Sequence, residues 1–428
     1  MLIPPYDIIS KEDQEKYYRT HPYNCIRLTL GKDFPEDTEF NNKYSRANSF
    51  FNAWIKNDIF KKDEEESIYA YEQKFSYKGK KYVRLGFICL FKLEDMETGK
   101  VFPHENTLPK PKIDRLSLLR ATAANFEPIF ALYIDEEDKI PRLIKKNIKR
   151  KPLVEAKDMF GIHNKLWKIS GKPALNKLIK EMAGKQVFIA DGHHRYESSL
   201  KYRNEMRTNA QKSTGDEPYN FIMTYFTNTS DKGLVIMPIH RLILDLSLKE
   251  KINLENRLLD CFDIEEIKFS KGSERSARKK LLKAMSKAAE GEHFFGMYLH
   301  GENKYSLLKL KYEKLIDKYT SADKLKEWKK LDITILHSLV IKDILGITDT
   351  DIEAENAVKY VHDDDKAFDL VKEGKYQIAF FLNPTKIEQV TALASKYEKM
   401  PQKSTFFFPK LLTGLVMYKM MPPEKYSF

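Results

Sequence analysis

Hydrophobic residues in the first half of the chain follow two spacings, one typical of strands and one typical of helices. Apolar runs rich in β-branched and aromatic residues, bounded by Gly or Pro, predict strands over 24–30, 67–75, 82–90, 128–133 and 185–190. Between these runs, apolar residues recur every three or four positions and predict helices over 44–57, 113–124, 172–182 and 193–206. This alternation predicts an α/β protein of mixed α+β character.

The composition changes near residue 245. Residues 246–290 are lysine-rich and more helical, a β-like patch follows over 293–310, and 314–345 is again helical. The last forty residues turn apolar and aromatic, which indicates that they return to a core. We therefore predict a catalytic region over 1–245, a more helical accessory domain over 246–395, and a C-terminal segment over 396–428 that returns to the active site. A length of 428 residues fits two or three domains.

The overall composition is that of a globular protein, with 42% hydrophobic and 32% charged residues. The chain contains no apolar run long enough to span a bilayer, and its N-terminus has none of the features of a signal peptide. Cys25, Cys89 and Cys261 are far apart and show no C-x-x-C spacing. This pattern predicts a cytoplasmic protein without a disulfide framework or a cysteine zinc site.

The formal charge of +12 raises the question of nucleic-acid binding. The lysines are spread along the chain and interleaved with acids, as over 61–66, and the densest basic run, 145–151, has no aromatic residues to stack on bases. We interpret the charge as a solvated basic face that steers anionic substrates, and we expect no nucleic-acid partner. A polyanion-binding surface is the alternative.

The most informative segment follows the predicted strand over 185–190. Asp191 and Gly192 form a turn signal, and a helix is predicted to begin at His193. The N-terminus of a helix presents unpaired N–H groups and the positive end of its dipole, so it favours an anion. His193, His194 and Arg195 place cations in this first turn, where they require a compensating negative charge. A bound phosphate, held bidentately by Arg195, would supply that charge. The alternative is a helix capped by Asp191 with two surface histidines.

The common nucleotide and zinc motifs are missing. The sequence contains no P-loop lysine motif, no Gly-x-Gly-x-x-Gly fingerprint and no His-Glu-x-x-His pair. The usual nucleotide-binding folds and a zinc centre therefore lose support.

The segment 189–197, Ile-Ala-Asp-Gly-His-His-Arg-Tyr-Glu, resembles the Asp-Gly-His-x-Arg phosphate-binding turn of the ParB/sulfiredoxin-like superfamily. This superfamily includes partition-protein CTPases, sulfiredoxins and free-serine kinases. The chain also resembles one widespread family of unknown function within it, on landmarks at 4–7, 102–107, 112–116, 189–197, 233–241 and 400–405. The resemblance implies a ParB/sulfiredoxin-like core in residues 1–245, with additional mixed-sheet and helical regions.

Within this group the chain is similar to pyrophosphate-dependent free-serine kinases. The similarity implies transfer of a phosphoryl group from pyrophosphate, or from ATP or ADP, to the hydroxyl of free L-serine, which gives O-phosphoserine for cysteine or serine metabolism. Mg²⁺ is the implied cofactor and would bind through the diphosphate, with Glu105 or Asp191 as candidate ligands. An N-terminal acidic residue acts as base in these kinases, so Asp7 is the candidate here. The alternative for Asp7 is an Asx-turn or a helix cap ahead of residues 10–13.

Several other polar residues are suited to a phosphate or substrate site. We predict catalytic roles for Asp7, His193 and Arg195, and binding roles for a larger set: Asp191, Gly192, His194, His104, Glu105, Thr107, Arg115, His240, Arg241, Lys403, Ser404 and Thr405. His104, Glu105 and Thr107 lie in a loop made rigid by Pro103 and Pro109, and His240-Arg241 is placed at the end of an apolar strand. Each of these sites has a structural alternative. Residues 104–107 could form a plain turn, and Arg115 could pair with neighbours of Asp114. His240 could be a buried, hydrogen-bonded residue, and 403–405 could be a simple loop.

Two other functions stay open. A nucleotide-gated DNA-binding protein of the ParB kind would use the same turn, but it would need a basic helix-turn-helix that we do not find. A phosphatase acting on phosphoserine would use the same residues in reverse, and only kinetics would separate it from a kinase.

Overall fold

The computed structural model describes residues 1–210, 214–244, 248–353 and 357–420. The chain folds into two compact units, which are described separately. The first unit comprises Met1–Pro103, Thr107–Val235 and the described residues from Phe407 onward. The second unit comprises His104–Asn106 and Ile236–Phe406.

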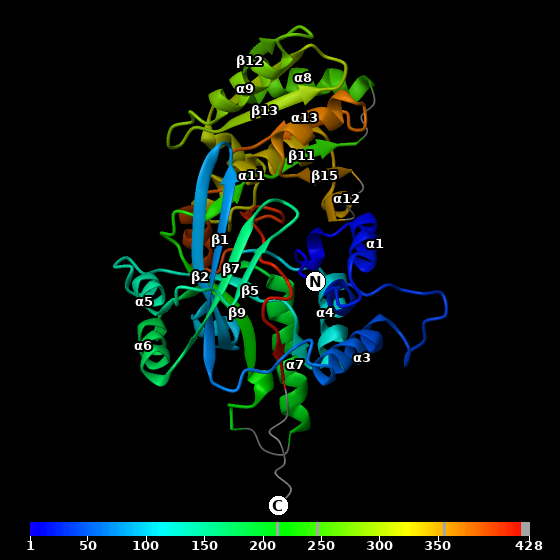
Figure 1. Cartoon of the computed structure of the whole chain (residues 1–428). Coiled ribbons are helices and arrows are strands. Elements are labelled where there is room, and N and C mark those ends of the chain that lie inside the picture. Colours follow the sequence, from blue (N-terminus) through cyan, green and yellow to red (C-terminus); the bar gives the residue numbers. More distant parts are fainter. Residues whose placement is uncertain (211–213, 245–247, 354–356, 421–428) are drawn as a thin grey trace, which may run out of the picture. The chain divides into compact units, whose positions relative to one another are not determined.

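The first unit is built on a mixed eight-stranded sheet (Figure 1) with the strand order β3-β8-β5-β9-β2-β1-β7-β6. The β3–β8 and β5–β9 pairs are parallel and the other neighbours are antiparallel. The bounds are β1 Ser67–Tyr77, β2 Lys80–Lys92, β3 Val101–Pro103, β5 Ile129–Tyr133, β6 Val154–Lys157, β7 His163–Ser170, β8 Val187–Asp191 and β9 Phe221–Asn228, with a small β4 (Ala124–Asn125) and β18 (Tyr418–Lys419) pair beside them.

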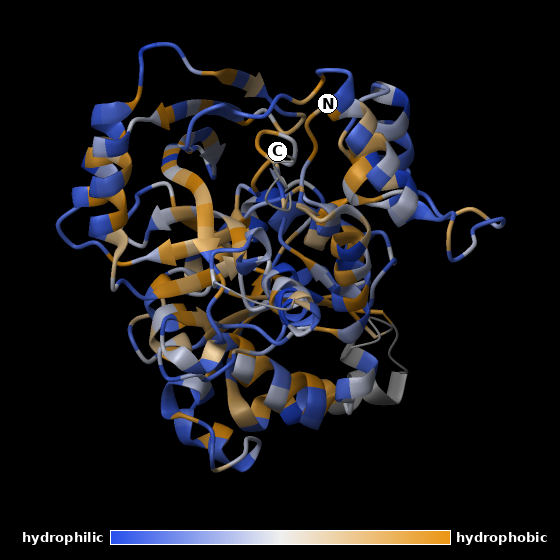
Figure 2. Ribbon diagram, turned by 90° about the horizontal axis from the view of Figure 1, so that it is seen from below, coloured by the Kyte–Doolittle hydropathy of each residue, from blue (hydrophilic) through white to orange (hydrophobic). Residues whose placement is uncertain are grey.

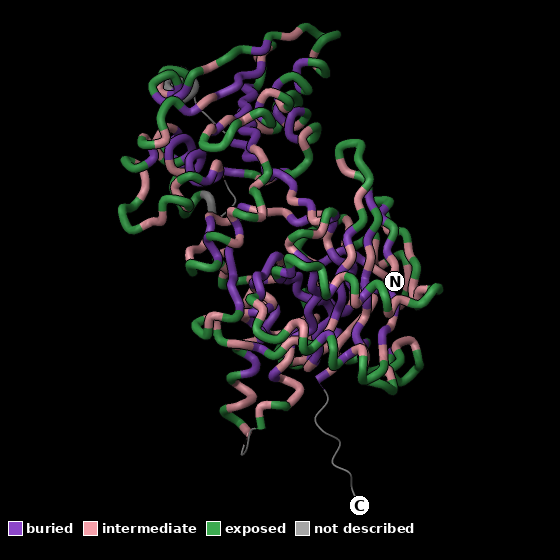
Figure 3. The backbone as a smooth tube through the Cα atoms, turned by 90° about the vertical axis from the view of Figure 1, so that its left-hand side faces the viewer, coloured by how far each residue is buried: buried purple, intermediate pink, exposed green. Residues whose placement is uncertain are grey.

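The longest strands of this sheet, β1 and β2, form a hairpin. Its two loop residues, Lys78 and Gly79, both have positive φ, which matches the right-handed twist of the flanking strands. Both strands carry hydrophobic and polar residues, hydrophobic residues occur in strands and helices alike (Figure 2), and buried positions run along the chain inside the unit (Figure 3).

The helices of the first unit are α1 Lys11–Thr20, α2 Ile26–Thr29, α3 Lys43–Lys56, α4 Pro109–Thr122, α5 Lys139–Asn147, α6 Lys172–Met182 and α7 His193–Asn209, with short 3-10 turns η1 Tyr6–Ile8, η2 Met96–Thr98 and η3 Pro218–Asn220. Ile140 and Ile144 of α5 and Leu178 of α6 pack with strand residues such as Ala70 and Phe87 in one core. The α3 side chains Phe51 and Trp54 belong to a separate cluster with Leu118 of α4.

The second unit contains an antiparallel six-stranded sheet in the order β12-β14-β13-β16-β11-β15. Its elements are β11 His240–Ile243, α8 Leu248–Cys261, β12 Phe262–Lys268, α9 Glu274–Met285, β13 Phe294–Leu299, β14 Lys304–Leu310, η4 Glu313–Lys318, α10 Lys326–Lys329, α11 Asp332–Ile335, the π-helix η5 Leu336–Ile344, α12 Asp349–Glu353, β15 Val358–Val361, α13 Asp364–Lys372, β16 Ile378–Phe381 and α14 Ile387–Ala394. The short strands β10 (Val235–Met237) and β17 (Phe406–Phe408) lie where the chain passes from one unit to the other.

The mixed α/β class is confirmed, as are the strands over 67–75, 82–90, 128–133 and 185–190 and all four helices of the first half. The strand predicted over 24–30 is wrong, because its central residues, Ile26–Thr29, form the short helix α2. Their β-branched and apolar side chains are buried by packing against α3 and the N-terminus, and this tertiary environment overrides local preference. The domain boundaries drawn from composition stay predictions.

The cysteines Cys25, Cys89 and Cys261 are free thiols. Among the described residues, no helix is long and apolar enough to cross a membrane.

Candidate active site

The turn between β8 and α7 has the predicted geometry. Asp191 ends the strand, Gly192 is the N-cap with φ 92°, and α7 begins at His193. A Cβ on Gly192 would lie 3.0 Å from both the Arg195 guanidinium and the side chain of Ile129. Glycine is therefore required both by the backbone conformation and by the close approach of its neighbours. Gly192, as the N-cap residue, has no side chain that could cap this helix.

Asp191 binds two cations at this turn. Its Oδ2 accepts a hydrogen bond from Nη2 of Arg195 at 2.8 Å, and its Oδ1 forms an ion pair with Lys410 of the C-terminal segment. Burial alone would raise the pKa of Asp191, but the charges of Lys410 and Arg195 outweigh it and lower the pKa. The carboxylate is thus held ionised between two positive groups.

The positive charge in the first turn of α7 already has internal partners. Besides Asp191, the carboxylate of Glu127 lies 3.9 Å from Nη1 of Arg195, and the same nitrogen donates to the carbonyl of Pro128 at 2.5 Å. Arg195 therefore has counter-charges within the protein, and the bound phosphate expected at this turn stays a prediction. Sequence spacing did not reveal the protein's own anions, because Glu127 is far from the turn along the chain.

Glu127 is the principal residue that sequence reasoning missed. It is buried, and its Oε1 accepts hydrogen bonds from the Tyr6 N–H at 3.2 Å and from the Thr413 hydroxyl at 3.0 Å. Burial raises the pKa of Glu127, although Arg195 and Arg115 act in the opposite direction. The only sequence signal was a lone acid next to Pro128 at the start of an apolar strand.

Arg115 is a further buried cation of the first unit and lines the same cavity as Glu127 and Arg195. Its guanidinium carbon lies 3.9 Å from the centre of the Tyr6 ring, and its Nε donates to Asp114 at 2.9 Å. Arg115 thus pairs with Asp114 itself, whereas the alternative had named the neighbours of Asp114 as partners.

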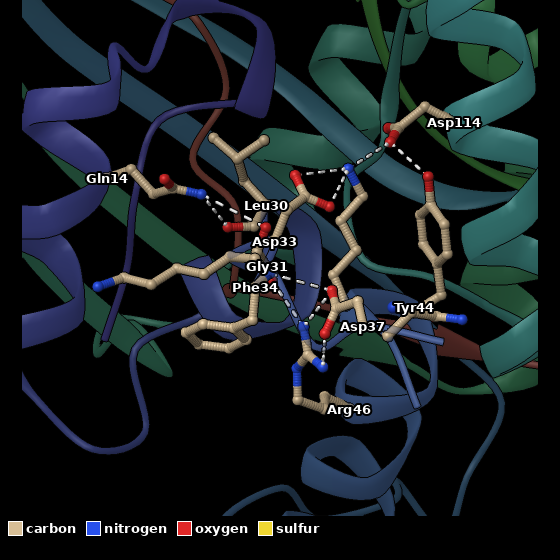
Figure 4. Close-up of polar contacts among 12 residues, drawn as sticks. Gln14, Leu30, Gly31, Asp33, Phe34, Asp37, Tyr44, Arg46 and Asp114 are labelled. Carbon is tan, nitrogen blue, oxygen red and sulfur yellow. Dashed lines mark hydrogen bonds and ion pairs between the residues drawn. The ribbon is translucent and has the colours of Figure 1, made fainter. Parts of the chain in front are cut away.

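Asp114 is in turn held by α3 (Figure 4). The Tyr44 hydroxyl donates to its Oδ1 at 2.8 Å, and Lys43 lies 3.4 Å from the same oxygen. In the same region Arg46 binds both oxygens of Asp37 at 2.6 and 2.9 Å. These contacts fix the polar residues at the start of α3 within the fold.

Two small cavities share Glu127 and Arg195 as a common wall. One, of about 10 Å³, is also lined by Pro5, Asp191 and Lys410. The other, of about 40 Å³, is also lined by Arg115, Asn125 and Ser199. The larger one has room for about three water molecules. Glu127 and Arg195 therefore line both the cavity at the turn and a second, larger cavity.

His193 and His194 begin α7, and Thr107 lies beside that helix. His194 Nε2 accepts a hydrogen bond from the Leu108 N–H at 2.9 Å, and the Thr107 hydroxyl donates to Glu197 at 2.6 Å. These bonds fix the segment before α4 on the first turns of α7. His193 is buried, so the surface position in the alternative interpretation does not apply to it.

Asp7 lies in the 3-10 turn η1 and is exposed. The cap of α1 is Ser10, which accepts from the Asp13 N–H at 3.1 Å, so Asp7 is not that cap. The negative charge of Asp7 acts on Arg195 and raises the pKa of that guanidinium together with Glu127 and Asp191, against the effect of burial.

In the second unit, two of the loops predicted to belong to the site lie together, residues 104–105 and residues 403–405. The ring of His104 hydrogen-bonds to Thr405 through Nε2 at 2.9 Å, and Glu105 accepts from the Lys403 N–H at 2.8 Å. The Ser404 hydroxyl donates to the carbonyl of Pro401. The predicted loops at 104–105 and 403–405 thus lie against each other.

His240 and Arg241 begin β11 and do not end the preceding strand, as the sequence had suggested. Both side chains are buried. His240 pairs with Asp364 at 2.8 Å, and Arg241 donates to His337 at 3.1 Å and to the Lys403 carbonyl at 2.7 Å. The alternative of a buried, hydrogen-bonded His240 describes this geometry.

A magnesium ligand set is not preassembled by acidic, histidine and cysteine residues. Within the described ranges, no group of three or more such residues could hold a metal ion. Asp191 is already bound to Lys410 and Arg195, so a metal would compete with both cations for it. Mg²⁺ commonly binds through one or two carboxylates together with substrate phosphates, and only such a mode fits these residues.

Residues 1–334 match a family described as a protein of unknown function, DUF1015. The chain belongs to this family. The match covers most of this DUF1015 protein and includes the turn at 191–195. Of the predicted site residues, only Lys403, Ser404 and Thr405 lie outside the matched range.

A search of curated proteins found no match. Among solved structures, the chain is similar to a free serine kinase variant in complex with AMP, at 12% identity over 75% of this chain and 87% of the other, with a TM-score of 0.38. It is also similar to a conserved hypothetical protein from Pyrococcus furiosus, at 13% identity over 78% and 95% of the two chains, with a TM-score of 0.36. The third, C-terminally truncated SbnI from Staphylococcus aureus, has 12% identity over 76% and 85%, with a TM-score of 0.33. Such low TM-scores carry no argument about the activity of this chain.

Proposed function

We propose that this DUF1015 protein is a kinase that transfers a phosphoryl group from pyrophosphate, or from ATP or ADP, to the hydroxyl of free L-serine. The observation that carries the proposal is the N-terminus of α7 directly after Gly192, with the cations Arg195 and Lys410 beside it. A helix terminus with cations beside it is suited to hold a phosphate and to stabilise the charge of the transition state. The resemblance of residues 189–197 to a phosphate-binding turn supports the same assignment.

The donor phosphates would be bound by the first turn of α7, Arg195 and Mg²⁺. Backbone N–H groups of the first α7 turn and the remaining N–H donors of Arg195 would bind the donor phosphates. Arg195 has five N–H donors, and its hydrogen bonds to Asp191 and Pro128 use two of them, so it can bind an anion without losing both partners. Magnesium would bind through the diphosphate and offset its charge.

The proton of the acceptor hydroxyl needs a base. Asp7 is exposed and within electrostatic range of Arg195, so we assign it this role. Glu127 lies closer to Arg195, but it is buried and tied to Tyr6 and Thr413, so we assign it the role of internal counter-ion.

The test is a direct assay. Purified protein is incubated with L-serine, Mg²⁺ and each donor in turn, and O-phosphoserine is measured by mass spectrometry. Formation of O-phosphoserine with one donor supports the proposal. Absence of product with every donor, from protein that is folded and monodisperse, refutes it. Incubation with O-phosphoserine alone measures phosphate release and shows whether hydrolysis is the faster reaction.

A further inference from the structure

Four buried polar side chains lie on one face of the large sheet in the first unit. Tyr71 and Gln73 come from β1, Arg84 from β2 and Asn164 from β7. Gln73 is directly opposite both Arg84 and Asn164 in the strand register, so their side chains share a face. We refer to these four residues as the strand cluster.

The strand cluster binds the main chain of residues 408–412. Arg84 donates to the carbonyls of Phe408 at 3.3 Å and Pro409 at 2.5 Å, and Gln73 donates to the carbonyl of Lys410 at 3.1 Å. The Tyr71 hydroxyl accepts from the Leu412 N–H at 3.4 Å and donates to Asn164 at 2.6 Å. Pro409 has no N–H group and so cannot donate to a strand ladder. The side chains of the strand cluster supply hydrogen bonds to the main chain after β17.

The position of Arg84 carries an energetic cost. It is completely buried, burial lowers its pKa, and no carboxylate in the described part of the chain forms an ion pair with it. Its acceptors are the Gln73 amide and two carbonyls, and its guanidinium carbon lies 4.7 Å from the centre of the Phe130 ring. A buried charge without an opposite charge costs several kcal/mol, whereas an apolar side chain of this size would pack without that cost. The planar guanidinium of Arg84 can bind both carbonyls at once, which an apolar side chain cannot do.

Held by the strand cluster, Lys410 forms its ion pair with Asp191 at the turn. We infer that Lys410 is a further cation of the phosphate site and that Arg84 is a positioning residue that acts through it. This inference rests on the proposed function. Lys410 would add positive charge beside the transferred phosphoryl group, while Arg84 would set the path of the main chain that carries Lys410.

A double-mutant cycle tests the coupling. Arg84→Met, Lys410→Met and the double variant are compared with the wild type by kcat/KM for O-phosphoserine formation. If Arg84 acts through Lys410, each single variant loses at least about tenfold, and the double variant is no worse than Lys410→Met alone within about twofold. Losses that multiply in the double variant would show that the two residues act separately and would overturn the inference.

Hydrogen–deuterium exchange tests the positioning without any turnover. Arg84→Met, and the milder Tyr71→Phe, are expected to raise exchange at residues 410–413. The control is Arg203→Met, a buried arginine of α7 that binds the Leu93 carbonyl and Asp95 and does not contact residues 408–412. It is expected to lower the melting temperature without raising exchange in that segment. Unchanged exchange in both test variants overturns the inference even if the wild type makes no product, so its failure is distinguishable from failure of the proposed function.

Discussion

Asp191, the last residue of β8, accepts a hydrogen bond at 2.8 Å from Arg195, the third residue of the helix that follows. The pair spans Gly192, whose positive φ brings the strand end and the first helical turn close enough to meet. With Lys410 on its other oxygen, Asp191 sets the position of two cations at the N-terminus of α7.

Arg195→Gln is expected to abolish donor turnover and to destabilise the protein. The substitution removes the charge that faces Asp191 and Glu127, and breaking a buried pair by removing one partner costs roughly 3–5 kcal/mol. We expect less than this here, about 2 kcal/mol, because Asp191 keeps Lys410. Melting temperature and O-phosphoserine formation are measured together, and near-normal turnover would show that the site lies elsewhere.

Gly192→Ala is expected to lose activity, whereas Gly184→Ala is its matched control. Both glycines have positive φ, but an added Cβ at Gly184 meets nothing within 4 Å, while at Gly192 it meets Arg195 and Ile129 at 3.0 Å. In both variants alanine must adopt the left-handed backbone conformation, which costs roughly 1–2 kcal/mol. The difference in activity between the two variants therefore reports the close contact of residue 192 with Arg195 and Ile129. Comparable activity in the two variants would contradict the close approach of Arg195 to Gly192.

Asp7→Asn separates catalysis from stability. Because Asp7 is exposed and caps no helix, we expect its melting temperature to stay close to that of the wild type. Removal of a general base should lower kcat by about a hundredfold or more. Asp13→Asn in α1, which removes another N-terminal acid, is the control for surface charge. If Asp7→Asn keeps full kcat, another group accepts the proton.

His293 in the second unit should make stability depend on pH. Its Nδ1 lies 2.7 Å from Asp332 and its Nε2 lies 3.4 Å from Glu313. Burial alone would lower the pKa of His293, but Asp332 and Glu313 outweigh it and raise the pKa. A raised folded-state pKa means that the stabilisation is complete below the unfolded pKa of about 6.5 and is lost as pH rises through the folded value.

The measurement is the melting temperature of wild type and His293→Gln across this range. The wild type should exceed the variant by more at about pH 6 than at about pH 9. A difference that stays constant, or that grows with pH, would show that His293 is neutral in the folded protein.

The sequence revealed the turn but not its internal charges. Strand, Asp-Gly and helix follow from local residue types, and β8, Gly192 and α7 lie where the sequence predicted them. Glu127 and Lys410 reach Arg195 and Asp191 only through tertiary folding, and neither lies near the turn along the chain. The local sequence pattern therefore suggested a bound anion beside the cations, and it did not show that Asp191 and Glu127 supply negative charge to Arg195 within the protein.

The predicted site residues divide between the two units for a related reason. Pro103 and Pro109 correctly marked a rigid loop, but His104 and Glu105 contact residues 403–405 in the second unit, whereas Thr107 contacts Glu197 in the first. Proline restricts the backbone locally and carries no information about long-range partners. The roles of these residues stay predictions.

A crystal structure with bound pyrophosphate and Mg²⁺ tests the central claim most directly. The account predicts phosphate oxygens within hydrogen-bond distance of backbone N–H groups in the first turn of α7, with Arg195 and Lys410 beside them. An anion bound elsewhere, with that helix terminus facing only protein or solvent, would contradict it.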